Sequence, residues 1–565
     1  MRSSASQAGP ALVVGGAGTG LAAIAGTASL LDLTAGPIAI GARGGTGTLA
    51  IANGGTVLAG TPNAATMPSI AVGVLGPGTL AVSGSGSYLL AGGGMSVGSG
   101  GPGTLSVTTG AVASIGADAS GEGGLSIGVG AAPGLGSGTA SVATGGVLRS
   151  ATWVAVGGGG EAGMLSVNGG SVAAGVSLVA GTGGGGSGSV TVGAGGVLTL
   201  GTALLLGLPG SSGSLSVGAG GSLDAGQAAL TVGAGGQGVL ALNAGTASAG
   251  TVALGAAGTV TVAGGASLSV AQAISVAPSG VLALQSGRVA AAQLANAGRI
   301  TGAGTIAQAA IVNTGTMAAA AGTLVLEGSV AGTGTLAIAP QASLQLNAGI
   351  AAGQTIAFQG STGTLAIEAP ASFAGTIAGF GPGDRIAVAA AGPLSQAWDA
   401  ASGTLRLTGP GQSIALHVTG AHTAADFATA IVPLGVPSGG AAVAAGDTLS
   451  VTASNTLVQP RTGTHTLYLS GAGDTIVVPP AGQGFLDIFG PALAGGNRLD
   501  FRQALSAAGW SGSLATLSQF LQVGTTFGAA LVSITPKGAQ APAAVLRLEG
   551  QGGLTLSGLV THALL

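Results

Sequence analysis

The sequence predicts an all-β protein: a parallel right-handed β-helix, or β-solenoid, followed by two small β-rich modules that contain short helices. Three observations support this prediction. Glycine accounts for 117 of the 565 residues, while 47% of the residues are hydrophobic. A short glycine-led motif recurs about every 25 residues over much of the chain. Within each repeat, apolar and small residues alternate with the period of two that a half-buried strand requires.

The composition describes a chain with a thin core of small side chains. Only 5% of the residues are charged and 2% are aromatic, whereas an ordinary globular domain has about 25% charged residues. Disordered chains are also poor in apolar residues, which this chain is not. The chain therefore has enough apolar surface to bury.

The repeat is marked by five-residue segments that begin with glycine. Five of them start 25 residues apart, namely Gly138–Val142, Gly163–Val167, Gly188–Val192, Gly213–Val217 and Gly238–Leu242. Gly78–Val82 and Gly103–Val107 share this spacing. The longer interval from 103 to 138 predicts an insertion, and the period shortens after 238, where the next segment begins at 258.

Each repeat contains three short apolar pieces separated by glycine. In the repeat at Gly188 they lie at 190–192, 197–200 and 204–206. Glycine clusters between the pieces supply corners with positive φ. One coil cannot bury its own apolar stripe, but stacked coils align valine on valine and pair every strand in parallel. A left-handed helix needs a shorter and stricter period, so we expect a right-handed solenoid of roughly 25-residue coils over residues 1–370.

The chain changes character near residue 370. All nine phenylalanines lie at 358 or later. We expect a module that caps the solenoid over 371–455, with a short helix near 423–431, and a second module over 456–565. In the second module, 497–509 and 511–523 predict helices, with Asp500 as a cap and Gly509 as the end of the first. Strands are expected at 530–536, 543–549 and 552–557.

The repeats resemble the glycine-rich strand repeats of bacterial autotransporter passengers and related surface β-solenoid proteins. The segment FAGTIAGFGPGDRIAV (373–388) resembles a module that often follows such solenoids. The last hundred or so residues are similar to C-terminal target domains of type I secretion substrates, through GAGDTIVV (471–478), 486–505 and 545–565. This resemblance implies an exported protein whose secretion signal lies at the C-terminus.

Several partners and compartments are disfavoured by composition. A net charge of −3 with 12 Lys and Arg residues gives no basic patch for nucleic acid. There is no cysteine for disulfides or thiolate metal sites. Glycine interrupts every apolar stretch, so we expect no membrane-spanning segment. The first residues contain no apolar run of signal-peptide length.

A polysaccharide lyase or hydrolase is the main alternative function, because such chemistry needs two or three converging carboxylates. The solenoid acids do not recur at the coil period; they are Asp32, Asp118, Glu122, Glu161, Asp224, Glu327 and Glu368. Asp118 and Glu122 lie close in sequence but in a glycine-rich insertion, which favours a solvated loop. The histidines, His417, His422, His465 and His562, do not have the spacing of a zinc site. We therefore expect no catalytic, cofactor-binding or metal-binding residue.

Two units resemble the calcium-binding G-x-G-x-D turn of stacked nonapeptides. One comprises Gly471, Gly473, Asp474 and Ile476, and the other Gly381, Gly383, Asp384 and Ile386. Calcium turns share ions between adjacent coils, so isolated units favour a structural turn. Matches to G-x-G-x-x-G, such as 128–134, are expected by chance among so many glycines. A threonine ladder for ice binding is interrupted by serine or methionine in the coils that begin at 163, 188 and 213.

Together these observations predict a secreted or cell-surface structural protein, adhesin-like and without catalysis. The expected location is extracellular or the outer surface of a Gram-negative bacterium. Expected partners are other copies of the chain, extracellular glycans, or host and cell-surface molecules.

Overall fold

The structure is a computed structural model. It describes all residues except 1–9, 61–67, 117–122, 131–135, 309, 391–393, 410–411, 436–440, 444–447, 452–456, 461–462, 470–472, 491, 494–495, 527–528 and 540. The chain forms two compact units, residues 1–337 and 338–565. The two boundaries expected from the sequence, after 370 and after 455, therefore both lie inside the second unit.

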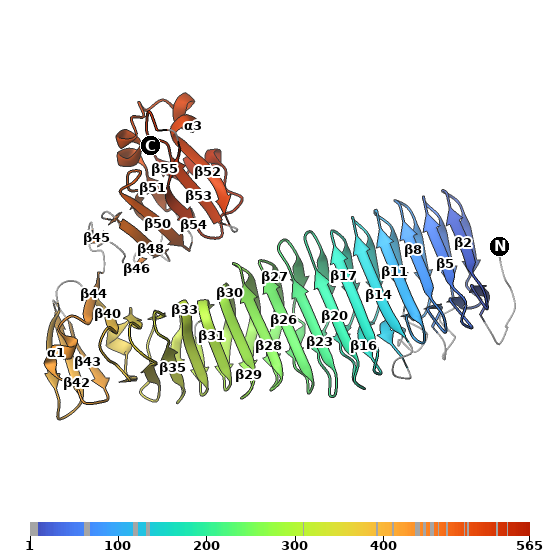
Figure 1. Ribbon diagram of the computed structural model, residues 1–565, viewed down its shortest axis with the longest axis horizontal. Helices are drawn as coiled ribbons and strands as arrows, with labels where there is room; N and C mark the ends of the chain where they lie inside the picture. Colours follow the sequence, from blue (N-terminus) through green and yellow to red (C-terminus); the bar gives the residue numbers. More distant parts are fainter. Residues whose placement is uncertain are drawn as a thin grey trace. The chain divides into compact units, whose positions relative to one another are not determined.

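The first unit is a parallel β-solenoid, as predicted (Figure 1). Most of its coils contain three strands, and each strand pairs in parallel with the equivalent strand of the next coil. The first face is formed by β2 (Gly20–Ala25), β5 (Gly47–Ala52), β8 (Gly78–Ser83), β11 (Pro102–Thr108), β14 (Ser137–Ala143), β17 (Ala162–Asn168), β20 (Ser187–Val192), β23 (Ser212–Val217), β26 (Gln237–Asn243) and β28 (Gly258–Ala263).

The other two faces are built in the same way. The second face is formed by β3 (Leu30–Leu33), β6 (Thr56–Ala59), β9 (Tyr88–Ala91), β12 (Val112–Ile115), β15 (Val147–Ser150), β18 (Ser171–Ala174), β21 (Val197–Leu200) and β24 (Ser222–Asp224). The third face is formed by β1 (Leu12–Val14), β4 (Ile38–Ile40), β7 (Ile70–Val72), β10 (Met95–Val97), β13 (Leu125–Val129), β16 (Trp153–Gly158), β19 (Ser177–Ala180), β22 (Ala203–Leu206) and β25 (Ala229–Val232).

The register of the first face confirms the predicted stacking. Gly163 pairs with Gly188, and Gly188 pairs with Gly213, so the first glycines of the repeats form one column. The inward residues two positions later, such as Leu165 and Val190, are no more than 1% exposed. Fully burying a valine or leucine side chain stabilises the fold by about 1.5–3 kcal/mol. The narrow aliphatic core is thus repeated in every coil.

A second glycine column interlocks with the first at one corner of the coil. Gly157, Gly181 and Gly207 end the third face with φ of 69°, 72° and 71°. A Cβ on Gly181 would overlap the backbone of Ser212 and Gly213 in the next coil. A Cβ on Gly213 would in turn overlap the carbonyl of Ala180 and the nitrogen of Gly207. Each coil therefore needs two glycines here, because two backbone segments touch with no room for a side chain.

The coils become shorter after residue 238, as the sequence spacing predicts. β27 (Thr246–Leu254) pairs with both β24 and β25, so it covers the second and third faces as one bent strand. The remaining strands of this part are β29 (Ser267–Val276), β30 (Val281–Asn296), β31 (Arg299–Ala307), β32 (Ala310–Asn313), β33 (Thr316–Leu326) and β34 (Ser329–Ala331), and β35 (Thr335–Ile338) lies at the unit boundary.

The second unit begins with a parallel ladder that passes residue 370 without a break. One set of paired strands is β36 (Ser343–Leu346), β38 (Thr364–Ile367), β40 (Arg385–Ala390) and β44 (Ile431–Gly435). The other is β37 (Thr355–Phe358), β39 (Thr376–Ala378) and β43 (Gln412–Val418). A short 3₁₀ helix, η1 (Pro370–Ser372), lies between β38 and β39.

Two features distinguish the end of this ladder. β42 (Thr404–Gly409) pairs antiparallel with both β41 (Ser395–Asp399) and β43, so the strand direction reverses there. The predicted helix near 423–431 is confirmed as α1 (Ala424–Phe427). The ring of Phe427 stacks on Phe380 at 5.4 Å and lies 4.9 Å from Trp398. Aromatic packing thus replaces the aliphatic core at this position.

The C-terminal part contains two sheets around a shared core, one of them parallel and the other with antiparallel strands at one edge. Consecutive strands alternate between them up to residue 500, whereas the three strands between 521 and 548 all belong to one sheet. One sheet contains β45 (Ala441–Val443), β47 (Leu457–Pro460), β49 (Thr475–Val477), β51 (Arg498–Asp500) and β55 (Ala563–Leu564). The other contains β46 (Thr448–Val451), β48 (Gly463–Leu469), β50 (Gly484–Phe489), β54 (Ala543–Leu548), β53 (Ala529–Ile534) and β52 (Leu521–Thr526).

Both predicted helices are present but shorter than expected, because 498–500 lies in β51 and 521–523 lies in β52. At the start of α2 (Arg502–Ala507), the Asp500 carboxylate accepts a hydrogen bond from the Arg502 N–H at 3.0 Å. Gly509 follows the end of this helix with φ 85°. The second predicted helix is η2 (Leu514–Thr516) with α3 (Leu517–Phe520). The prediction of a strand at 552–557 is wrong.

α4 (Leu556–Val560) begins inside that segment. The Thr555 hydroxyl accepts a hydrogen bond from the Gly558 N–H at 3.2 Å and caps the helix. The alternation of leucine with small residues resembled a strand, but local capping of the helix overrides it. Among the described residues, no helix has the length and apolar character needed to cross a membrane.

Candidate functional site

The solenoid acids that were candidates for catalysis lie in different surroundings. Asp118 and Glu122 lie outside the described residues. Asp32 accepts a hydrogen bond from the Thr34 hydroxyl, and Asp224 accepts one from Ser248 at 3.0 Å. Glu327 forms an ion pair with Arg288 at 3.0 Å. Each of these carboxylates interacts with a neighbour in its own or a nearby coil.

Among the described residues of the first unit, Glu161 is the buried acid. It precedes β17 at the glycine corner and is 2% exposed. Burial raises the pKa of Glu161, and a hydrogen bond from the Gly136 backbone opposes part of this rise. A second carboxylate near it would be needed for glycoside chemistry. No group of three or more His, Asp or Glu side chains suited to a metal occurs in the part of the chain that the structure describes.

Glu368 lies directly after β38, in the second unit. Burial raises the pKa of Glu368 from 4.5 to about 7. Its neighbours include polar residues of the preceding coil, since Ile367 pairs with Leu346 and the next residue of that coil is Asn347. The Asn347 amide oxygen accepts a hydrogen bond from Gln345 at 2.9 Å. This carboxyl group therefore titrates in a range where ordinary glutamates are already ionised.

We expect the stability of the chain to fall between pH 4.5 and 7 because of Glu368. Its folded pKa of about 7 exceeds the unfolded value. The stabilising contribution is therefore complete below the unfolded pKa and is lost as the pH rises through the folded pKa. In the Glu368→Gln variant, the fall in the free energy of unfolding of the second unit over this pH window should be smaller by about 1–3 kcal/mol. Equal pH slopes in the variant and the native chain would contradict this expectation.

The four histidines do not converge. His417 is exposed on β43, and His465 on β48 is 1% exposed. His562 lies near the last strand. His422 packs beside the aromatic rings, and its Nδ1 lies 4.0 Å from the Asp426 carboxylate. The arrangement of His422 is that of a packing residue at the end of the ladder.

One of the two G-x-G-x-D units is a structural turn. The Asp384 side chain is 2% exposed, and its two oxygens accept the N–H groups of Gly363 at 2.8 Å and Gly381 at 2.9 Å. The carboxylate thus joins two consecutive coils. In the other unit, Gly471 lies outside the described residues. The Asp474 N–H donates to the buried amide oxygen of Asn497 at 2.8 Å.

Asn497 was missed by the sequence reasoning, although the motif Gly-Gly-Asn-Arg-Leu (495–499) repeats the pattern Gly-Asp-Arg-Ile of 383–386. The shared feature is a buried Asp or Asn directly before a strand, whose side-chain oxygen accepts a backbone N–H of the preceding coil. At both turns, this hydrogen bond connects one coil to the coil before it.

Asp384→Ala should reduce the stability of the second unit by about 1–3 kcal/mol, because two buried N–H groups lose their acceptor. Asp384→Asn retains one acceptor oxygen and should lose less. Calcium should leave the denaturation midpoint of the native chain unchanged. A rise of that midpoint with calcium, abolished in both variants, would contradict the structural interpretation.

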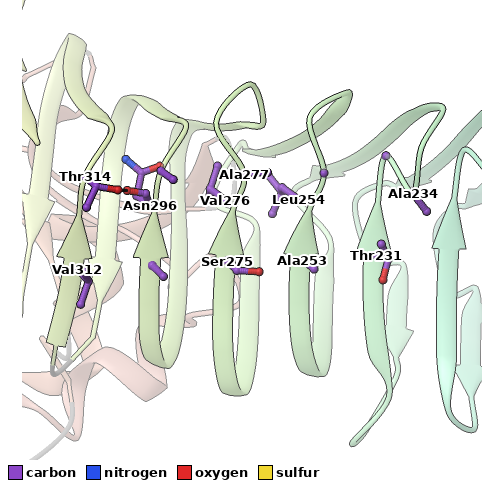
Figure 2. Close-up of a pocket in the computed structure, with 14 residues that line it drawn as sticks. Thr231, Ala234, Ala253, Leu254, Ser275, Val276, Ala277, Asn296, Val312 and Thr314 are labelled. Atoms are coloured by element: carbon purple, nitrogen blue, oxygen red, sulfur yellow. Dashed lines mark hydrogen bonds between the residues drawn. The ribbon is translucent and has the colours of Figure 1, made fainter.

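A groove of about 550 Å³ follows the third face of the solenoid across successive coils (Figure 2). Its outward column comes from stacked strands: Thr231 pairs with Ala253, which pairs with Ser275. Figure 2 shows these residues on successive strands, with the turn residues Ala234 and Ala277 above them. We call this the corner groove. It has no charged residue among those that line it.

Two buried asparagines lie at one end of the corner groove, and Asn296 is among the residues that line it. Asn296 and Asn313 occupy the inward column that holds Val276 in the preceding coil. They are 1% and 0% exposed, and the Asn296 amide donates to the Asn313 oxygen at 2.8 Å. The sequence signal was the pair of short motifs Ala-Asn-Ala-Gly and Val-Asn-Thr-Gly at equivalent positions. The corner groove could contact a ligand through its shape and through small apolar side chains, and no acidic or basic side chain lines it.

The comparisons with known proteins found a likeness among solved structures. No family model matches the chain, and no curated protein matches it. Among solved structures, the chain is similar to a hyper-glycosylated TibA55-350 fragment whose glycosylation was catalysed by TibC. The identity is 15%, the TM-score is 0.24, and the similarity covers 65% of this chain and 92% of that one.

Proposed function

We propose that the chain is a secreted or cell-surface structural protein of a Gram-negative bacterium, adhesin-like and without catalysis. The observation that carries this proposal is the continuous parallel register of the first unit. Coil after coil, it presents small uncharged side chains outward, as in the stacked strands β14, β17 and β20. Such a body is rigid and chemically unreactive, and it suits a spacer or an adhesive surface better than an enzyme.

The distribution of acids supports the non-catalytic part of the proposal. The described carboxylates of the solenoid are ion-paired, as Glu327 is with Arg288, hydrogen-bonded to a hydroxyl, as Asp224 is to Ser248, or buried singly, as Glu161 is. Incubation of the purified chain with neutral and acidic polysaccharides should release no reducing ends and no unsaturated sugars. Turnover of any of these substrates would contradict this part and favour the polysaccharide-active alternative.

The location is tested on cells. An epitope tag placed before residue 456 should be found in the culture medium or on intact, unpermeabilised cells. Deletion of 456–565 should retain the chain inside the cell, because the resemblance of this region to type I secretion target domains implies that it carries the export signal. Full retention of the undeleted chain would contradict a surface role, whereas continued secretion of the deleted chain would contradict only the export route.

A further inference from the structure

A second groove runs along the first face of the solenoid, on a different face from the corner groove. It has a volume of about 500 Å³ and crosses five consecutive coils, on strands β14, β17, β20, β23 and β26. We call it the hydroxyl groove. One wall is the column Ser137, Ala162, Ser187, Ser212 and Gln237, and the other is the column Thr139, Met164, Ser189, Ser214 and Val239.

The geometry of the hydroxyl groove follows from the strand period. Residues on either side of each column glycine, such as Ser187 and Ser189 beside Gly188, point outward, while the glycine backbone forms the floor. Residues two apart in a strand are separated by roughly 7 Å. The groove therefore accommodates one extended chain along the solenoid axis, and not a rounded ligand.

The walls repeat the same chemistry at every coil. Equivalent residues of stacked strands lie about 4.8 Å apart, and the register holds through all five strands. A single small molecule would use one set of groups, whereas a linear polymer laid along the axis meets a similar set at each coil. Repeated weak contacts of this kind add up through multivalency. The repetition favours a polymeric ligand.

The type of polymer follows from the groups on offer. No charged residue lines the groove, and its polar groups are the hydroxyls of serine and threonine and one glutamine amide. Met164 and Val239, 51% and 41% exposed, add apolar contacts. Hydroxyls beside C–H surface complement a neutral sugar chain, which itself carries hydroxyls and C–H faces. An acidic polymer would find no cation to pair with.

An extended polypeptide is less well matched to this groove. A peptide that adds to a sheet needs free backbone N–H and C=O groups at a strand edge. Here the backbone groups of β17, β20 and β23 are used by the neighbouring coils on both sides. The Ser214 hydroxyl also donates a hydrogen bond to the floor of the groove, at the Gly188 carbonyl oxygen, at 3.4 Å. Only side chains are available to a ligand.

We propose that the hydroxyl groove is a binding site for a linear neutral polysaccharide, aligned with the solenoid axis. This inference rests on the proposed extracellular role, and it names the class of ligand that such a surface would hold. The full chain should bind neutral hexasaccharides, with cellohexaose, xylohexaose and laminarihexaose as probes in calorimetry. Binding should weaken steeply for the corresponding disaccharides, because fewer coils are engaged.

Two variants and a matched control locate the site. Met164→Glu and Ser189→Glu place a charge in the groove at exposed or half-buried positions and should weaken hexasaccharide binding about tenfold or more. Thr199→Glu introduces the same charge on the second face, in the same coil as Ser189, and should leave binding within about twofold. Circular dichroism checks that all three variants are folded.

The inference is overturned if none of the three neutral hexasaccharides binds, if the Thr199 variant loses binding equally, or if polygalacturonate binds better than the neutral probes. These results would leave the extracellular structural role intact, because that role is tested separately by the location of the chain. If the chain were retained inside the cell but still bound hexasaccharides, the proposed extracellular role would be contradicted and the binding site in the hydroxyl groove would still be supported.

Discussion

Gly213→Ala should destabilise the solenoid by about 3 kcal/mol or more, although it adds only one methyl group. The added Cβ would overlap the carbonyl oxygen of Ala180 and the backbone nitrogen of Gly207. Both are main-chain atoms, Ala180 in the preceding coil and Gly207 at the same corner as Gly213, so no rotamer change relieves the overlap. Overpacking a tight interior typically costs about 1–3 kcal/mol when side chains can move, and here the two coils themselves must separate.

Gly218→Ala is the matched control in the same coil. Gly218 has ordinary φ, and its added Cβ would lie 3.7 Å from the nearest atom, the carbonyl oxygen of Val192. We expect a change within about 1 kcal/mol, and a slight gain is consistent with the reduced entropy of the unfolded chain. Hydrogen exchange measures the effect locally, which suits a stacked structure whose coils contact only their neighbours.

In the Gly213 variant, fast exchange should appear in β19, β22 and β23, and spread outward from them. Equal protection in the Gly213 and Gly218 variants would show that the corner tolerates a side chain. In that case the two glycine columns would be a consequence of composition and not a requirement of the fold.

The sequence predicted the repeating part of the fold because its information is periodic. The 25-residue spacing placed Gly163, Gly188 and Gly213 in one column, and the pairing has this register. The same alignment contains the hydroxyl groove, since the residues before and after each glycine fall into two outward columns. The serine and methionine at these positions were considered only as interruptions of a threonine ladder.

Non-repeating features were less predictable, because their contacts join positions with no sequence period. Phe358, Phe380, Trp398 and Phe427 lie up to 69 residues apart and meet only when the ladder of the second unit is assembled. The abundance of phenylalanine after 358 indicated a change of core, but not its geometry. Likewise, the corner glycines with positive φ cannot be told from the column glycines until the two backbone segments are placed together.

The second large effect is expected for Phe427→Ala, which should destabilise the second unit by about 3–5 kcal/mol. Phe427 is fully buried, stacks on Phe380 with an interplanar angle of 10°, and contacts Trp398 and His422. Its removal leaves a cavity among rigid rings that have few ways to collapse. Phe427→Leu retains most of the apolar volume and should lose less.

Leu514→Ala serves as the surface control, since Leu514 is 66% exposed and should change stability by no more than about 0.5 kcal/mol. The Trp398 ring lies 4.9 Å from Phe427, so its fluorescence should report the loss of packing at this end of the ladder before global unfolding.

The consequence of this loss extends beyond stability. The reversal of strand direction in β41–β43 ends the parallel ladder, and an unprotected ladder exposes N–H and C=O groups that can pair with another chain. Phe427→Ala should therefore increase concentration-dependent association, measured by light scattering, whereas Leu514→Ala should not. A Phe427 variant that is destabilised but stays monomeric at high concentration would show that the aromatic rings fill a core without protecting the strand edges.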